Sequence, residues 1–219
     1  MKKNLLQTLI LMVVCLPFGA SAQRYLSEIF TDVTITPNVQ FGQNVLPPYF
    51  TQGVLDTFDL KADIYEPVGD AAPARATIIL IHTGSFLPIF YNGQPTGAKT
   101  DSAVAEMCRR FARMGFTAIS MDYRYGWNPV STDQEVRTGT ILQAAGRGVQ
   151  DAKACVRYFR NNALNANTYH IDESRIILGG VGAGGYIALA YATVQGVADY
   201  SIPKFLASQN NPIRSEEHT

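Results

Sequence analysis

The sequence is poor in charge, in histidine and in cysteine, and each shortage excludes a class of protein. Only 16% of its 219 residues are charged, with 18 Lys and Arg against 18 Asp and Glu, whereas 47% are hydrophobic. A chain so apolar can bury enough surface to fold, which excludes general disorder. The balanced charge also argues against nucleic-acid binding, which normally requires an excess of basic side chains on one face.

The compact basic cluster in the chain consists of Arg109, Arg110 and Arg113. So short a cluster is typical of a solvated helix face, and we expect no nucleic-acid partner. The chain has only three histidines, and no spacing of His, Cys, Asp and Glu matches a zinc or calcium signature. We therefore expect neither a metal nor another cofactor.

The sequence lacks the roughly 20 consecutive apolar residues that a membrane-spanning helix needs. The apolar run at residues 5–16 follows Lys2 and Lys3 and precedes Ala20-Ser21-Ala22, a small-x-small cleavage pattern. This arrangement is typical of a secretory signal peptide over residues 1–22. We therefore expect a secreted or periplasmic protein without a membrane anchor, whose mature chain starts at Gln23.

Cysteine is scarce as well, because only Cys108 and Cys155 follow the predicted cleavage site. Two cysteines are too few for a disulfide scaffold, and each lies on the apolar stripe of a predicted helix. Both are therefore expected to be buried free thiols. The length of the mature chain predicts one domain.

Strand and helix patterns alternate through most of the chain. Alternating apolar and polar residues at 28–35 and 55–65 predict strands of an antiparallel N-terminal edge. Buried strands are predicted at 76–81, 116–121 and 175–178, and helices near 104–115, 152–159 and 184–194. This order predicts an α/β fold, with a mostly parallel central sheet and helices on both faces.

Two glycine-rich turns follow buried strands, where α/β sheets usually place their sites. They are His82-Thr83-Gly84-Ser85-Phe86 and the seven residues 179–185, Gly-Gly-Val-Gly-Ala-Gly-Gly. Together with Asp122-Tyr123-Arg124 and the segments 150–152 and 169–176, they resemble the α/β-hydrolase superfamily. The resemblance is to its secreted carboxylesterase and bacterial feruloyl-esterase-like branch, and it runs from Phe58 to Ala192. It implies an α/β-hydrolase fold, carboxylic-ester hydrolysis and, if the protein is active, a small ester or acylated-carbohydrate substrate.

The resemblance also shows what the second turn lacks. In the family this turn is a nucleophile elbow, G-x-S-x-G, which presents a serine above the sheet. Here it reads Gly180-Val181-Gly182-Ala183-Gly184, so Gly182 stands where the family has its nucleophile. Glycine has no side chain that can attack a carbonyl carbon, and we expect no serine-hydrolase turnover. Thr83 and Ser85 carry hydroxyls on the facing loop, but the sequence identifies no base for either.

The first turn looks like the family's HGGG-type oxyanion loop. By that match the backbone N–H groups of Gly84, Ser85 and Ala183 would bind the developing oxyanion. The resemblance assigns loop support to His82, Asp122 and Arg124, with the last two as an ion pair. The alternative is that Asp122 and Arg124 simply cap the end of a strand. The apolar segment Phe86–Gly93 next to this loop either lines a pocket for an acyl or aryl group or forms a packed cover.

The family's catalytic acid and histidine come later in the chain, where only His218 follows the elbow. His218 lies in the six residues 214–219, Arg-Ser-Glu-Glu-His-Thr, which back-translate to AGATCGGAAGAGCACACG, the start of a sequencing adapter. We therefore predict a non-native tail at 214–219 and a domain at 23–213 that is incomplete at its C-terminus. The last strands of the fold, with the acid and histidine, would then be missing.

Two other functions fit the same residues. The chain could be a non-catalytic binding or structural relative of the esterases. Alternatively, Gly180, Gly182 and Gly185 satisfy the G-x-G-x-x-G pattern of a dinucleotide-binding oxidoreductase. That pattern needs an acidic residue about 20 positions further on, at the end of a strand. Asp199 lies nearer, and no convincing strand precedes it.

Overall fold

The computed structural model describes residues 23–49, 54, 56–93, 96–194, 196 and 199. In chain order the elements are β1 (Val33–Leu46), β2 (Asp56–Pro67), β3 (Arg75–Ile81), α3 (Ile89–Asn92), α4 (Ser102–Arg113), β4 (Thr117–Met121), α5 (Gln134–Leu164), β5 (Ile171–Gly180) and α6 (Ala183–Thr193). The predicted signal peptide at 1–22 and the predicted tail at 214–219 lie outside the described residues.

The described strands form one sheet in the order β1-β2-β4-β3-β5. β3 pairs in parallel with both β4 and β5, whereas β2 pairs antiparallel with β1 and with β4. The predicted parallel centre with an antiparallel N-terminal edge is therefore confirmed. The predicted strand at 28–35 is displaced, because the strand begins only at Val33. Ile29 and Phe30 instead donate backbone hydrogen bonds to the carbonyl of Arg113 at the end of α4.

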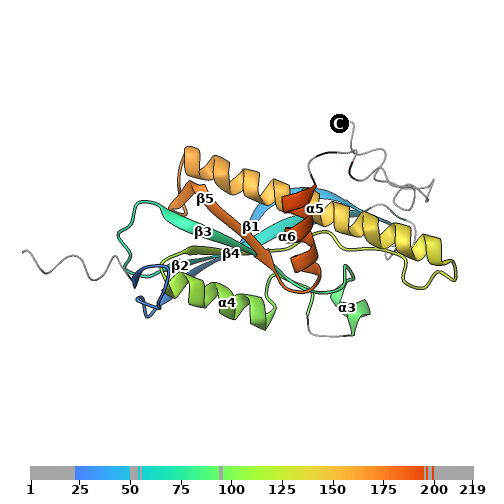
Figure 1. The fold of residues 1–219 in the computed structure, drawn as a ribbon, viewed down its shortest axis with the longest axis horizontal. Helices are drawn as coiled ribbons and strands as arrows, with labels where there is room; N and C mark the ends of the chain where they lie inside the picture. The colour runs from blue at the N-terminus through green and yellow to red at the C-terminus, as the bar shows by residue number, and fades with distance from the viewer. Residues whose placement is uncertain are drawn as a thin grey trace, which may run out of the picture.

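Side chains on the central strands alternate between two hydrophobic clusters, one on each face of the sheet. Ile79 and Ile81 of β3 pack into the cluster that contains α5 and α6 residues such as Phe159 and Ile187. Ile78 and Leu80 point the other way, into the cluster formed with α4. Figure 1 shows α4 on one side of the sheet and α5 and α6 on the other. Burial on both faces is why these strands are continuous apolar runs in the sequence.

The helices follow the predicted pattern, with one large difference in length. α4 and α6 begin and end close to the predicted limits, but α5 starts at Gln134, far before the predicted segment at 152–159. Its N-terminus is capped by Asp133, whose side chain accepts a hydrogen bond from the backbone N–H of Glu135. Cys108 in α4 and Cys155 in α5 are buried free thiols, as predicted. None of the helices in the described ranges is long and apolar enough to span a bilayer.

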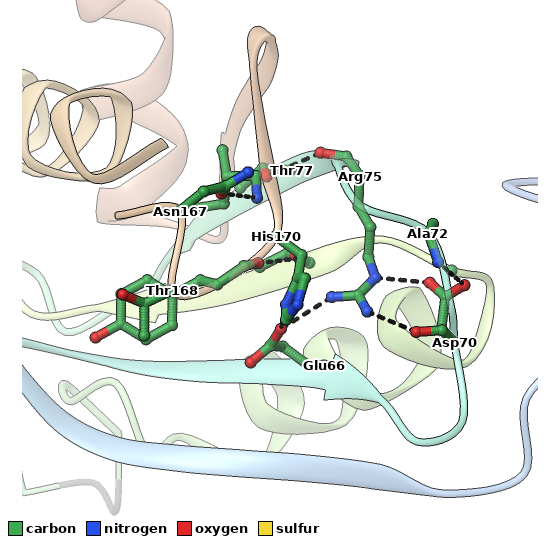
Figure 2. A network of polar contacts seen from close by, with 12 residues as sticks. Glu66, Asp70, Ala72, Arg75, Thr77, Asn167, Thr168 and His170 are labelled. Atoms are coloured by element: carbon green, nitrogen blue, oxygen red, sulfur yellow. Dashed lines mark hydrogen bonds and ion pairs between the residues drawn. The ribbon is translucent and has the colours of Figure 1, made fainter. Parts of the chain in front are cut away.

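The edge where β3 and β5 begin is held by a network of charged side chains (Figure 2). Arg75, the first residue of β3, is buried and bonds to Asp70 at 2.6 Å and to Glu66 at 2.9 Å. His170, just before β5, contacts the same Glu66 oxygen through Nδ1 at 3.0 Å. β5 has ten residues, so His170 lies about 30 Å from the turn that follows this strand.

Candidate functional site

The candidate site is centred on the turn between β5 and α6, where Gly182 has a backbone conformation that favours glycine. Its φ of 55° and ψ of −118° lie in a left-handed region that costs other residues strain. The turn packs directly against the end of β3, because Val181 donates a backbone hydrogen bond to the carbonyl of Ile81 at 3.0 Å. A Cβ on Gly184 would lie 2.2 Å from the same carbonyl oxygen. The turn is therefore the tight strand-to-helix elbow that the sequence predicts.

The side chain of Thr83 occupies the space beside Gly182. A Cβ built on Gly182 would lie 2.2 Å from Thr83 Oγ1 and 3.0 Å from Thr83 Cβ, closer than side-chain atoms approach one another. Any residue larger than glycine at position 182 would therefore require Thr83 to move. The loop that carries Thr83 lies beside the elbow because both follow adjacent parallel strands.

The loop at 82–86 is anchored through its carbonyl groups. The Thr83 carbonyl accepts hydrogen bonds from His82 Nδ1 at 2.5 Å and from the Tyr123 hydroxyl at 2.9 Å. The Ser85 carbonyl accepts one from Trp127 Nε1 at 2.9 Å. Within the described ranges, no group accepts a hydrogen bond from the backbone N–H of Gly84, Ser85 or Ala183. The three predicted donors therefore have no hydrogen-bond acceptor among the described residues.

This anchoring imposes strain on the loop. Gly84 has a φ of 118°, and the next two residues, Ser85 and Phe86, have φ values of 55° and 57°. Each non-glycine residue in this region costs on the order of 1–3 kcal/mol, which the surrounding packing must offset. Phe86 is buried, and its ring packs edge to face on Tyr123 at 5.8 Å between centroids. The loop is therefore held in one shape by its neighbours.

His82 of this loop is buried and lies next to the partly buried carboxyl group of Asp122. Their closest atoms, Nε2 and Oδ1, are 3.6 Å apart. Burial lowers the pKa of His82 to about 4, although the Thr83 carbonyl and the charge of Asp101 oppose this shift. Burial raises the pKa of Asp122 to about 6, although a hydrogen bond from the Lys99 backbone N–H opposes that shift. At neutral pH the imidazole is therefore uncharged and the carboxyl group is mostly ionised.

The predicted ion pair between Asp122 and Arg124 is wrong. Arg124 instead bonds to Asp151 of α5, through both its backbone N–H at 2.8 Å and its Nε at 3.0 Å. It also donates to the carbonyl of Val45 at the end of β1. Asp151 is almost fully buried, and a buried carboxylate needs a cationic partner to offset its lost hydration. Arg124 therefore joins α5 to β1.

A cavity of about 330 Å³ is lined in part by His82 and Asp122, and none of the elbow residues lines it. Phe58, Pro88, Ile89, Phe90 and Tyr125 form its apolar walls. Of the segment at 86–93, Phe86 is thus a packed cover, whereas residues 88–90 line a pocket. The acidic and aromatic surroundings of this cavity could not be recognised in the sequence, because their members come from four separate segments.

No base for a nucleophile is found at the elbow within the described residues. His82 is bonded to the Thr83 carbonyl through Nδ1, His170 lies at the opposite end of β5, and His218 falls outside the described part of the chain. The described residues also contain no group of three or more His, Cys, Asp and Glu side chains that could hold a metal. The basic cluster on α4 is paired with acids, since Arg110 and Arg113 both bond to Glu28.

Comparison with known proteins identifies a family. A family model described as BD-FAE matches residues 62–214, which include the loop at 82–86 and the elbow. A search of curated proteins found no match. The resemblance predicted from the two glycine-rich turns is therefore confirmed by the family model.

Several solved structures of bacterial esterases are also similar to this chain. Esterase 2 from the planctomycete Thermogutta terrifontis has 25% identity and a TM-score of 0.42, over 68% of this chain and 43% of that one. An inhibited esterase B from Lactobacillus rhamnosis has 19% identity and a TM-score of 0.48, over 82% of this chain and 46% of that one. The chain thus spans less than half the length of these two esterases.

Proposed function

The chain belongs to the BD-FAE family of esterase-like α/β-hydrolases, and we propose that it is a secreted member that binds esters or acylated carbohydrates without hydrolysing them by a serine mechanism. Gly84, Ser85 and Ala183 would donate their backbone N–H groups to the ester carbonyl oxygen. Secretion follows from the signal-peptide pattern at residues 1–22.

The observation that carries this proposal is the matched pair of Gly182 and Thr83. A single altered codon at position 182 would leave room for the lost serine side chain. Here Thr83 fills that room, and a serine Cβ would meet its hydroxyl at 2.2 Å. The pairing supports a genuine glycine at the elbow. Backbone donors do not depend on the missing side chain, so carbonyl binding can persist without a nucleophile.

The first part of the test asks whether the protein has a nucleophile that reacts covalently. We expect no adduct, by intact mass, when the purified protein is incubated with a fluorophosphonate that labels activated serines. We also expect no inhibitor-sensitive hydrolysis of p-nitrophenyl acetate, because preorganised donors alone leave only on the order of 10³–10⁴-fold catalysis over water. An adduct on Thr83 or Ser85 would disprove the non-catalytic assignment and identify a substitute nucleophile.

The second part of the test asks whether the three donors bind an anionic oxygen. Butyrate is a suitable probe, since its carboxylate resembles an ester product. We expect its addition to shift the amide ¹H resonances of Gly84, Ser85 and Ala183 downfield, while amides of α4 on the other face of the sheet stay unchanged. If these three resonances do not respond, the oxyanion-binding assignment is wrong even if the protein is inert toward the fluorophosphonate.

A further inference from the structure

The cavity beside His82 has an aromatic wall built from distant segments. Phe58 comes from β2, Tyr125 follows β4, and Phe90 lies in α3. The rings of Phe58 and Tyr125 meet edge to face, with centroids 5.5 Å apart and an interplanar angle of 78°. Phe90 is 75% exposed and stands at the rim. A cation that binds against the face of such a ring is attracted by the ring's negative quadrupole.

The polar part of the cavity is a carboxylate that can accept more hydrogen bonds than the protein donates to it. Asp122 lines the cavity and accepts one hydrogen bond, from the Lys99 backbone N–H to Oδ1 at 2.8 Å. Within the described residues no group donates to its Oδ2. His82 Nδ1 bonds to a carbonyl, which can only accept, so the neutral ring has no proton on the Nε2 that faces Asp122.

The charge around this carboxylate is not balanced by the protein. The ammonium group of Lys99 is bonded to Asp63, at 2.7 Å. Asp101 nearby accepts only backbone N–H groups, from Gly97 and Ala98. Asp122 therefore feels the charges of two further carboxylates, Asp63 and Asp101, and of one ammonium group, and the described residues that line the cavity include no lysine or arginine. A cation entering the cavity would be attracted and an anion repelled.

We propose that this cavity is a binding site for a small organic ammonium ion, which places its charge against Asp122 and its alkyl groups against Phe58, Phe90 and Tyr125. The site does not depend on the proposed function, because none of the elbow residues lines it. The volume of about 330 Å³ is at the lower end of small-molecule sites, which fits a ligand of a few carbon atoms.

Calorimetric titration of the purified protein with two isosteric probes tests this site. Choline carries a quaternary ammonium group, and 3,3-dimethylbutan-1-ol has the same shape without the charge. We expect choline to bind at least tenfold more tightly than the neutral alcohol. Equal affinity for the two probes, or heat from neither, would overturn the proposal, because a purely apolar cavity has no preference for the cation.

Two variants separate the contributions of the carboxylate and the rings. Asp122→Asn should weaken choline about tenfold and leave the alcohol unchanged, whereas Asp172→Asn, which removes an exposed carboxylate at the start of β5, should change neither. Phe90→Leu keeps an apolar group at an exposed position and removes the aromatic face, so it should weaken choline alone, by about threefold. Choline affinity that is unchanged in either Asp122→Asn or Phe90→Leu contradicts the proposed site.

Discussion

At the scale of single residues, substitutions at Gly182 and Thr83 should have coupled effects on the stability of the protein. Gly182→Ser introduces a side chain at a φ of 55° and 2.2 Å from Thr83 Oγ1. Strain and overlap together should cost about 2 kcal/mol, or a melting temperature lower by roughly 5 °C. Adding Thr83→Gly to Gly182→Ser should recover about half of this loss, although Thr83→Gly alone destabilises the protein. Thermal unfolding of the four proteins measures this coupling.

The same turn provides a control for that cycle. A Cβ on Gly185 would make only ordinary contact, 3.4 Å from the carbonyl oxygen of Gly180. Gly185→Ser should therefore change stability by less than about 0.5 kcal/mol, with no coupling to Thr83→Gly. If Gly182→Ser is equally well tolerated, Thr83 is not what excludes a side chain from the elbow.

Residue types and spacing predicted part of this site but not its contacts. Gly182, Gly84 and His82 could be identified because their positions relative to the buried strands are local features of the chain. The partner of Arg124 could not, because Asp151 lies 27 residues away and reaches it only when α5 packs on the sheet. The same is true of Thr83, since its contact with Gly182 depends on the pairing of β3 with β5.

At the scale of elements, Asp70 joins the start of β3, through Arg75, to the N-terminal segment that carries Arg24, and this joint should depend on pH. Burial alone would raise the pKa of Asp70, but hydrogen bonds from Arg24 and Arg75 outweigh it and hold the pKa well below its usual range. A depressed folded-state pKa contributes stability that is present above about pH 4 and is lost as the pH falls further. Asp70→Asn should therefore cost about 2 kcal/mol at pH 7 and much less at pH 2.

Urea unfolding at several pH values from 7 to 2 measures this difference. The exposed pair of Asp172 and Arg175 offers a matched comparison. Asp172→Asn should change the stability much less than Asp70→Asn at pH 7, since exposed pairs are largely screened. A stability gap between the native protein and Asp70→Asn that stays constant down to pH 2 would show that the carboxylate charge does not hold this joint.

The boundaries of helices and strands could be predicted where the buried residues are mostly apolar. They could not be predicted where polar and small residues are buried as well. β3 and β4 are buried along their whole length because both faces are covered, and most of their residues are apolar. The first half of α5 shows no helical repeat of apolar residues in the sequence. Its buried face carries Thr140, Gln143 and Arg147 together with glycines such as Gly148. A stripe of polar and small residues gives no apolar repeat, although these residues are buried by the sheet and the loop after β4.

At the scale of the whole molecule, β5 and α6 leave apolar surface open at one side of the described sheet. β5 pairs only with β3 among the described strands. Ile177 on β5 is 51% exposed, and Tyr186 and Leu189 on α6 are 71% and 68% exposed. An unpaired strand edge next to exposed apolar side chains is a template for association with another chain. We therefore expect the protein to self-associate in a concentration-dependent way through this surface.

Sedimentation velocity between micromolar and hundred-micromolar concentrations tests this expectation. Ile177→Lys places a charge on the open strand and should shift the protein toward monomer, and Leu189→Glu should do the same from α6. Val68 is similarly exposed, at 49%, but lies in the turn after β2, so Val68→Lys should leave the association unchanged. Weaker association in all three variants would indicate general charge repulsion. A native protein that sediments as one monomer across the whole range would show that this surface does not mediate association, because the unpaired N–H and C=O groups of an open edge strand would otherwise pair with a second copy at high concentration.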